Sequence, residues 1–217
     1  MSNPDSFIQE VNEEVRRERL FGYVRRYGWI AVLVVLLVVG GAGFNEWRKA
    51  RAQAEAEAFG DAVLAALDRS GAEARVEALA GIEATGSRAA ILQLLRAAEA
   101  QQAGDTATAL AAFAAVEADA ELPSSYRQLA ALQRVMLAGP TLDPAERESV
   151  LSGLAQPDAP FRPLAMEQIA LMRIEAGERD AALAILRELL DEPQLTQGLR
   201  ARAQQLIVSL GGAPGTG

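Results

Sequence analysis

One uncharged stretch near the N-terminus limits what this chain can fold into more than any other feature. From Tyr27 to Phe44 the sequence reads YGWIAVLVVLLVVGGAGF, without a charged residue. As an α-helix this stretch would extend about 27 Å, which is long enough to cross the hydrocarbon core of a bilayer. A helix that is apolar on every side could otherwise be buried only if protein surrounded it completely. We therefore predict a transmembrane helix over residues 27–44.

The residues that flank this stretch predict its orientation. Amphipathic aromatic rings favour the headgroup layer, and Tyr27, Trp29 and Trp47 mark the two ends of the stretch. Basic residues are more numerous before the stretch than just after it, which predicts that the N-terminus lies in the cytoplasm. Those before it are Arg16, Arg17, Arg19, Arg25 and Arg26, and those soon after it are Arg48, Lys49 and Arg51.

The same stretch could instead be the apolar region of a cleaved signal peptide. Gly41, Ala42 and Gly43 are small enough for signal peptidase. However, the segment before the stretch is long and contains acidic residues, and the stretch is longer than a usual signal-peptide core. These features favour an uncleaved anchor.

Composition favours a helical domain beyond the anchor and gives little support to an enzyme. Alanine, leucine, glutamate and arginine are abundant, whereas aromatic residues make up only 5% of the 217 residues. The chain has no cysteine and no histidine, which removes disulfides, thiolate zinc sites and the commonest general base. We expect no enzymatic activity, no cofactor and no metal. The net charge of -8, which lies beyond the stretch, argues against nucleic acid as a partner.

The residues before the stretch predict a short amphipathic helix from Ser6 to Leu20. Ser6 and Gln9 have the spacing of a capping box, and Phe7, Val11 and Val15 recur at helical intervals. This helix could lie on the inner leaflet or dock on a partner, or it could simply be a solubilising leader. The sequence leaves these alternatives open.

Beyond Trp47 the sequence predicts one long helix, continuous with the anchor, and then a series of shorter helices. Apolar residues at helical spacing alternate with turn signals such as Gly-Asp, Gly-Glu and Asp-Pro. Asp143 before Pro144, with Glu146 three residues on, is typical of a helix start. The predicted helices cover residues 72–84, 87–103, 106–119, 124–137, 144–155, 163–176, 179–191 and 195–210. Residues 211–217 lack an apolar anchor and are predicted to be a disordered tail.

Two of the predicted helical pairs share a pattern of small residues and a glycine turn. Ala97 to Phe113 reads AAEAQQAGDTATALAAF, and Ala170 to Leu186 reads ALMRIEAGERDAALAIL. The order of small residue, Ala-Gly-acid turn, Ala-Leu and large apolar residue is that of a tetratricopeptide repeat. Residues 124–155 leave room for a third pair without the glycine turn. An all-α, tetratricopeptide-like α-solenoid is therefore expected, with another antiparallel helical array as the alternative.

In such an array the first helix of each pair lines a concave groove. The residues predicted to face it are mostly apolar and include no lysine, which favours an apolar extended segment or an inserted helix as the ligand and disfavours a carboxylate-terminated peptide. They are Ile91, Leu94, Ala98 and Gln101 from one pair, and Leu164, Glu167, Leu171 and Ile174 from the other. The terminal helix could equally fill the groove, because an open apolar groove is an aggregation liability.

The whole layout resembles the YfgM-like family, bacterial ancillary subunits of the SecYEG translocon. The features in common are a charged leader, a span entered through Arg-Arg-Tyr-Gly-Trp, a long helix rich in alanine and glutamate, and degenerate tetratricopeptide pairs. The resemblance implies a single-pass protein of the bacterial inner membrane, with a cytoplasmic leader (1–26), a span in the lipid bilayer (27–44), a periplasmic domain (45–210) and a tail (211–217).

The resemblance also implies partners and a role. The implied partners are the SecYEG translocon, a membrane-anchored periplasmic chaperone of the prolyl-isomerase type, and exported polypeptides as they emerge. A periplasmic scaffold for envelope assembly or cell division remains the alternative function, because the same fold would serve it equally well.

Overall fold

The described residues of the chain, in a computed structural model, are all helical apart from turns and loops. The backbone is described for residues 4–193 and 195–213, and the side chains for residues 25, 26, 29, 30, 33, 34, 36–193 and 195–213. No strand occurs in these ranges, so the all-α prediction is confirmed. The helices are α1 (Pro4–Leu67), α2 (Ala72–Ala80), α3 (Ser87–Gln102), α4 (Thr106–Ala118), α5 (Ser124–Ala138), α6 (Pro144–Leu154), α7 (Arg162–Glu175), α8 (Arg179–Leu190) and α9 (Gln197–Ser209), with a short 3-10 helix η1 (Gly139–Thr141).

The chain divides into two compact units, residues 1–61 and 62–217. The described backbone of the first unit belongs to α1, so the residues of the predicted leader helix, the predicted span and the long helix after Trp47 lie in one helix. Across the residues that could be searched, no helix is both long and apolar enough to cross a membrane. The predicted span includes Tyr27, Gly28, Ala31, Val32 and Val35, whose side chains lie outside the described residues. The span therefore stays a prediction.

In the second unit, most helix boundaries lie within one or two residues of those predicted. α2 is the exception, because it ends at Ala80 and not at residue 84. Gly81 follows it, and the Gly81 N–H closes the last turn on the carbonyl oxygens of Glu77 and Ala78. At the other end of the unit, α9 begins two residues late because Thr196 caps it, accepting a hydrogen bond from the Leu199 N–H.

The two glycine turns found in the sequence have the same geometry. Gly104 after α3 and Gly177 after α7 both have φ of 76°, in the left-handed region that only glycine adopts cheaply. In each turn the glycine N–H and the next N–H bond back to the carbonyl oxygens three and five residues earlier, which is a Schellman motif. Gly211 and Gly212 end α9 in the same way, so these two residues of the predicted tail form a helix cap. Residues 214–217 lie outside the described residues.

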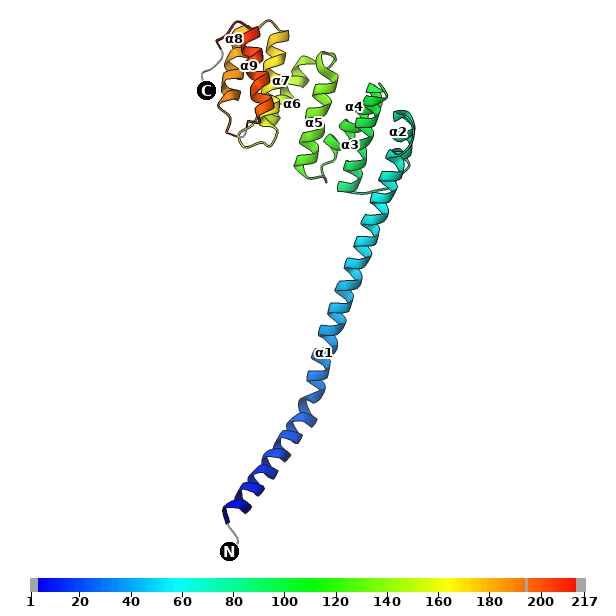
Figure 1. Ribbon diagram of the computed structural model, residues 1–217, viewed down its shortest axis with the longest axis vertical. Coiled ribbons are helices and arrows are strands. Elements are labelled where there is room, and N and C mark those ends of the chain that lie inside the picture. The colour runs from blue at the N-terminus through cyan, green and yellow to red at the C-terminus, as the bar shows by residue number, and fades with distance from the viewer. Residues whose placement is uncertain (1–3, 194, 214–217) are drawn as a thin grey trace. The chain divides into compact units, whose positions relative to one another are not determined.

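The core of the second unit consists of three hydrophobic clusters that follow one another along the chain. The first joins α3, α4 and α5, the second joins α5, α6 and α7, and the third joins α7, α8 and α9. Each helix from α2 onward packs mainly on its neighbours in sequence (Figure 1). This nearest-neighbour packing is consistent with an α-solenoid.

The small residues of the repeated pattern are all buried. Ala97, Ala109, Ala170 and Ala182 have no exposed surface. Side chains of this size let paired helices approach closely. The large residues at the end of the pattern, Phe113 and Leu186, are also buried.

Arginine–glutamate pairs cross the gaps between consecutive helices. Arg75 of α2 binds Glu99 of α3 at 2.6 Å, and Arg147 of α6 binds Glu175 of α7 at 2.5 Å. Arg134 of α5 binds Glu117 of α4 and Glu146 of α6, and these hydrogen bonds raise the pKa of Arg134. These pairs give the covered guanidinium groups carboxylate partners, although the Nε of Arg147 has no hydrogen-bond partner among the described residues.

Candidate functional site

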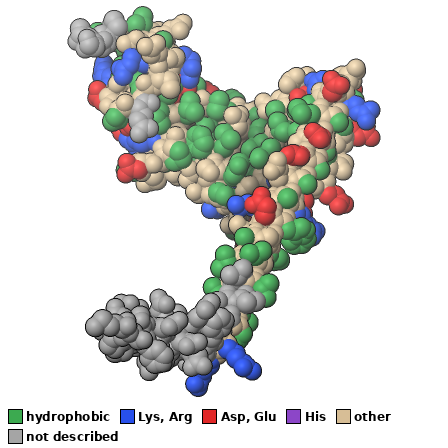
Figure 2. Space-filling model, turned by 60° about the horizontal axis from the view of Figure 1, so that its bottom comes forward, with side chains coloured by type: hydrophobic (Ala, Val, Ile, Leu, Met, Phe, Trp, Pro, Cys, Tyr) green, Lys and Arg blue, Asp and Glu red, His purple; other side chains and the backbone are tan. Residues whose placement is uncertain are grey.

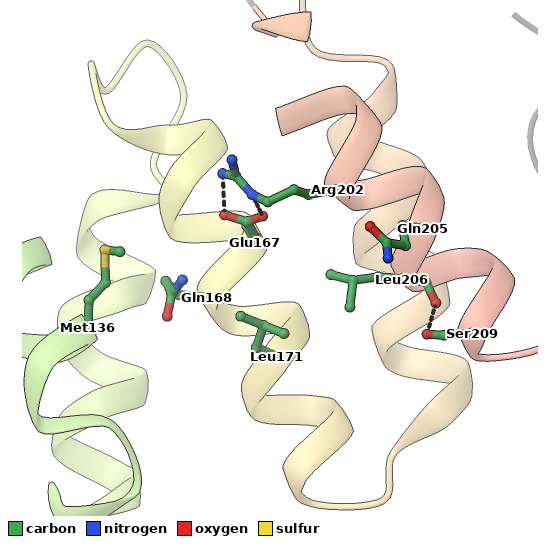
Figure 3. Close-up of a pocket in the computed structure, with 8 residues that line it drawn as sticks. All are labelled: Met136, Glu167, Gln168, Leu171, Arg202, Gln205, Leu206 and Ser209. Atoms are coloured by element: carbon green, nitrogen blue, oxygen red, sulfur yellow. Dashed lines mark hydrogen bonds and ion pairs between the residues drawn. The ribbon is translucent and has the colours of Figure 1, made fainter. Parts of the chain in front are cut away.

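A hollow of about 700 Å³ lies between α5, α7 and α9. Helices α5 and α7 are the first helices of their pairs, and α9 follows the last pair. The lining side chains are Met136 from α5, Glu167, Gln168 and Leu171 from α7, and Arg202, Gln205, Leu206 and Ser209 from α9 (Figure 3). A hollow of this volume is within the usual range for ligand sites in proteins.

Apolar side chains from all three helices contribute to the hollow. Met136 is 46% exposed, and Leu171 and Leu206 are half-buried. Leu206 points from α9 toward α7, and Met136 lies across from Gln168 (Figure 3). In the space-filling view, hydrophobic side chains gather over the middle of the array, and charged ones lie mainly toward its ends (Figure 2).

The charged groups of the hollow neutralise each other. Arg202 Nε and Nη2 donate to the two carboxylate oxygens of Glu167 at 2.7 and 3.0 Å. The Glu167 side chain is only 8% exposed, whereas that of Arg202 is 54% exposed. The hydrogen bond to Glu167, and then the charge of Glu167, raise the pKa of Arg202. The hollow therefore presents a paired carboxylate and no uncompensated charge among its lining residues.

The remaining polar groups of the hollow are uncharged. Gln168 and Gln205 add side-chain amides, and the Ser209 hydroxyl donates to the Leu206 carbonyl oxygen. Amide groups beside apolar side chains could hydrogen-bond the main chain of a peptide that also buries apolar side chains. This chemistry suits noncovalent binding of an uncharged polypeptide segment.

Two of the eight residues predicted to face the groove, Glu167 and Leu171, lie in this hollow. On the same helix, Leu164 packs against the second and third core clusters, and Ile174 is half-buried outside the hollow. On α3, Leu94 packs on the first cluster. Ile91, at 37% exposure, Ala98 and Gln101 are exposed. No described lining residue of the hollow comes from α3. A binding role for any of the eight stays a prediction.

Six lining residues were not predicted from the sequence, namely Met136, Gln168, Arg202, Gln205, Leu206 and Ser209. Gln168 could have been found, because it lies four residues after Leu164 and three before Leu171, on the same face of one helix. Met136 belongs to the pair without a glycine turn, for which the sequence gives no register. The α9 residues were missed because only the first helix of each pair was expected to line the groove, with the terminal helix as its possible filler, whereas α9 forms one wall of the hollow.

The described residues contain no group of three or more acidic side chains placed to hold a metal ion. The sequence matches no family model, no curated protein and no solved structure. The resemblance to YfgM-like proteins therefore rests on the layout of the sequence alone.

Proposed function

We propose that this protein is a membrane-anchored periplasmic interaction module with a tetratricopeptide-like array, and that it binds polypeptide segments in the hollow between α5, α7 and α9. The observation that carries the proposal is the hollow itself, which combines apolar side chains, amides and a neutralised ion pair. An extended apolar segment of an exported polypeptide has the chemistry that this surface would recognise.

The pattern of exposure on α1 supports the membrane anchor. Large apolar side chains that the structure describes in the predicted span, from Leu36 to Val39, are each more than 60% exposed, and Phe44 is 59% exposed. Contiguous apolar surface of this kind is rare on a protein that meets only water. A bilayer around residues 27–44 would remove this surface from water, with Trp47 at the headgroup layer.

The proposed partners come from the resemblance. They are the SecYEG translocon, a periplasmic chaperone of the prolyl-isomerase type, and newly exported chains. The test is affinity purification of the full-length chain from cells in a mild detergent, with a photo-crosslinking residue at Leu36 to capture contacts within the membrane. Adducts with SecY, SecE or SecG would support the translocon assignment. Adducts confined to division or envelope-assembly proteins would overturn it and move the function to a scaffold.

A further inference from the structure

The sulfur atoms of this chain all belong to methionines, of which there are four, because the sequence has no cysteine. In proteins, mild oxidants such as hydrogen peroxide act chiefly on the sulfur of cysteine and methionine, and an exposed sulfur reacts faster than a buried one. No thiol is therefore present to compete with the methionines for such an oxidant. Exposure should decide which of the methionines reacts first.

The three methionines that the structure describes differ greatly in exposure. Met166 and Met172 of α7 are 4% and 9% exposed, and Met166 belongs to the hydrophobic cluster that joins α7, α8 and α9. Met136 of α5 is 46% exposed and lines the hollow between α5, α7 and α9. Among the described residues, the methionine that an oxidant in solution reaches most easily therefore lies in the candidate binding site.

Oxidation of Met136 would make an apolar part of the hollow polar. The thioether of Met136 accepts hydrogen bonds only weakly, and it shares the hollow with Leu171 and Leu206. Methionine sulfoxide carries a polar oxygen on the same sulfur. Water can donate to this oxygen, and so can the amide of Gln168, which lies across from Met136 (Figure 3). An apolar ligand that covered the oxygen would displace the water without replacing its hydrogen bonds, which is costly.

We propose that Met136 is a site of oxidation by hydrogen peroxide, and that its sulfoxide weakens the binding of apolar polypeptide segments in the hollow. The sulfur lone pair attacks one peroxide oxygen, so that an S–O bond forms while the O–O bond breaks. The other oxygen leaves as hydroxide and takes the proton of the first, which gives water. The sulfur loses two electrons and the peroxide gains them. The effect on binding rests on the function proposed above, whereas the oxidation does not.

The first experiment measures the rate of oxidation at each described sulfur. The purified full-length chain in detergent is treated with hydrogen peroxide, and the gain of one oxygen by each methionine is followed by peptide mass spectrometry. Met136 should react at least about fivefold faster than Met166 or Met172, in line with their exposed fractions. The same treatment in denaturant is the control, because the three rates should converge once folding no longer protects two of the sulfurs. Comparable rates in the folded chain would overturn the proposal.

The second experiment measures the effect of oxidation on binding. A photo-crosslinking residue at Leu171 reports contacts in the hollow, and its adducts with exported polypeptides are quantified in cells before and after peroxide treatment. We expect the yield of adducts to fall at least about fivefold in the otherwise wild-type chain. Met136→Leu places an apolar side chain there that peroxide does not oxidise. Peroxide should therefore leave the yield of this variant at its own untreated level, whatever that level is.

Two results of the second experiment would overturn the effect on binding. One is an unchanged yield of adducts from a chain whose Met136 is oxidised. The other is an equal fall in Met136→Leu, because the loss would then arise elsewhere. If Leu171 gives no adducts even before peroxide treatment, the proposed function fails and the effect on binding fails with it. The rates measured in the first experiment would still decide whether Met136 is the oxidation site.

Discussion

At the scale of single residues, the ends of the helices are where short sequence signals have the clearest structural consequences. Gly104 and Gly177 take the same left-handed conformation after helices that are distant in the sequence. Asp105, next to Gly104, caps the following helix by accepting a hydrogen bond from the Thr108 N–H at 3.0 Å. Each of these residues can be tested by one substitution.

Replacing Gly104 or Gly177 with alanine should lower the free energy of unfolding by about 1 to 2 kcal/mol, because a Cβ is strained in the left-handed region. The measurement is chemical denaturation of the full-length chain, followed by circular dichroism. Gly153→Ala is the control, because Gly153 lies inside α6 in open space, where alanine favours the helix. Equal effects of the three substitutions would contradict the assigned conformations.

Asp105 should make the stability of the array depend on pH in the acid range. Its hydrogen bonds with Thr108 hold its pKa below the ordinary value, so the folded state binds the proton less readily than the unfolded state does. The stabilisation is therefore complete above the unfolded pKa, near pH 4, and is lost as the pH falls through the lower folded pKa. Asp105→Ala should lower the melting temperature at pH 7, and the difference from the wild type should shrink below about pH 4. A difference that stays constant with pH would exclude this role.

At the scale of helices, ion pairs between neighbours fix how each helix sits on the next. The pair of Glu167 and Arg202 joins α7 to α9 across the hollow between α5, α7 and α9, and its carboxylate is almost completely buried. Because α7 and α9 both line the hollow, this ion pair also fixes the distance between two of its walls.

Arg202→Ala should destabilise the chain by about 1 to 3 kcal/mol, because it leaves the buried Glu167 carboxylate without a partner. Glu167→Gln in the same chain should recover part of the loss, since an amide costs less to bury than a carboxylate. The measurement is again chemical denaturation. Arg200→Ala is the matched control on α9, because Arg200 is exposed and, among the described residues, hydrogen-bonds the Leu190 carbonyl oxygen and no carboxylate. An equal cost for Arg200→Ala and Arg202→Ala would show that the ion pair contributes nothing.

At the scale of the whole chain, the helical composition and most helix boundaries of the array could be predicted from the sequence. Local signals such as Asp143 before Pro144, or Gly177 before α8, determine where a helix begins or ends through contacts within one turn. They can therefore be recognised in the sequence. The residues of the hollow are harder to predict, because an apolar residue at helical spacing suits the core as well as a groove. Leu164 and Leu171 illustrate this, since one packs on the core and the other lines the hollow.

The contacts across the hollow depend on distant parts of the chain. Arg202 binds Glu167 from another helix, and no local sequence pattern around either residue predicts this ion pair. The register of α5, which brings Met136 to the hollow, also follows from packing and not from a local turn signal. Sequence reasoning therefore found the α7 side of the site and missed the other two helices.

The most direct test of the central claim is in-cell photo-crosslinking from Leu171, in the hollow, compared with Ala184 on the exposed face of α8. The proposed function predicts adducts with exported polypeptides from Leu171, few from Ala184, and loss of the Leu171 adducts when Met136→Glu places a charge in the hollow. Equal labelling from both positions, or Leu171 adducts that persist in Met136→Glu, would contradict the claim that this hollow binds polypeptide segments.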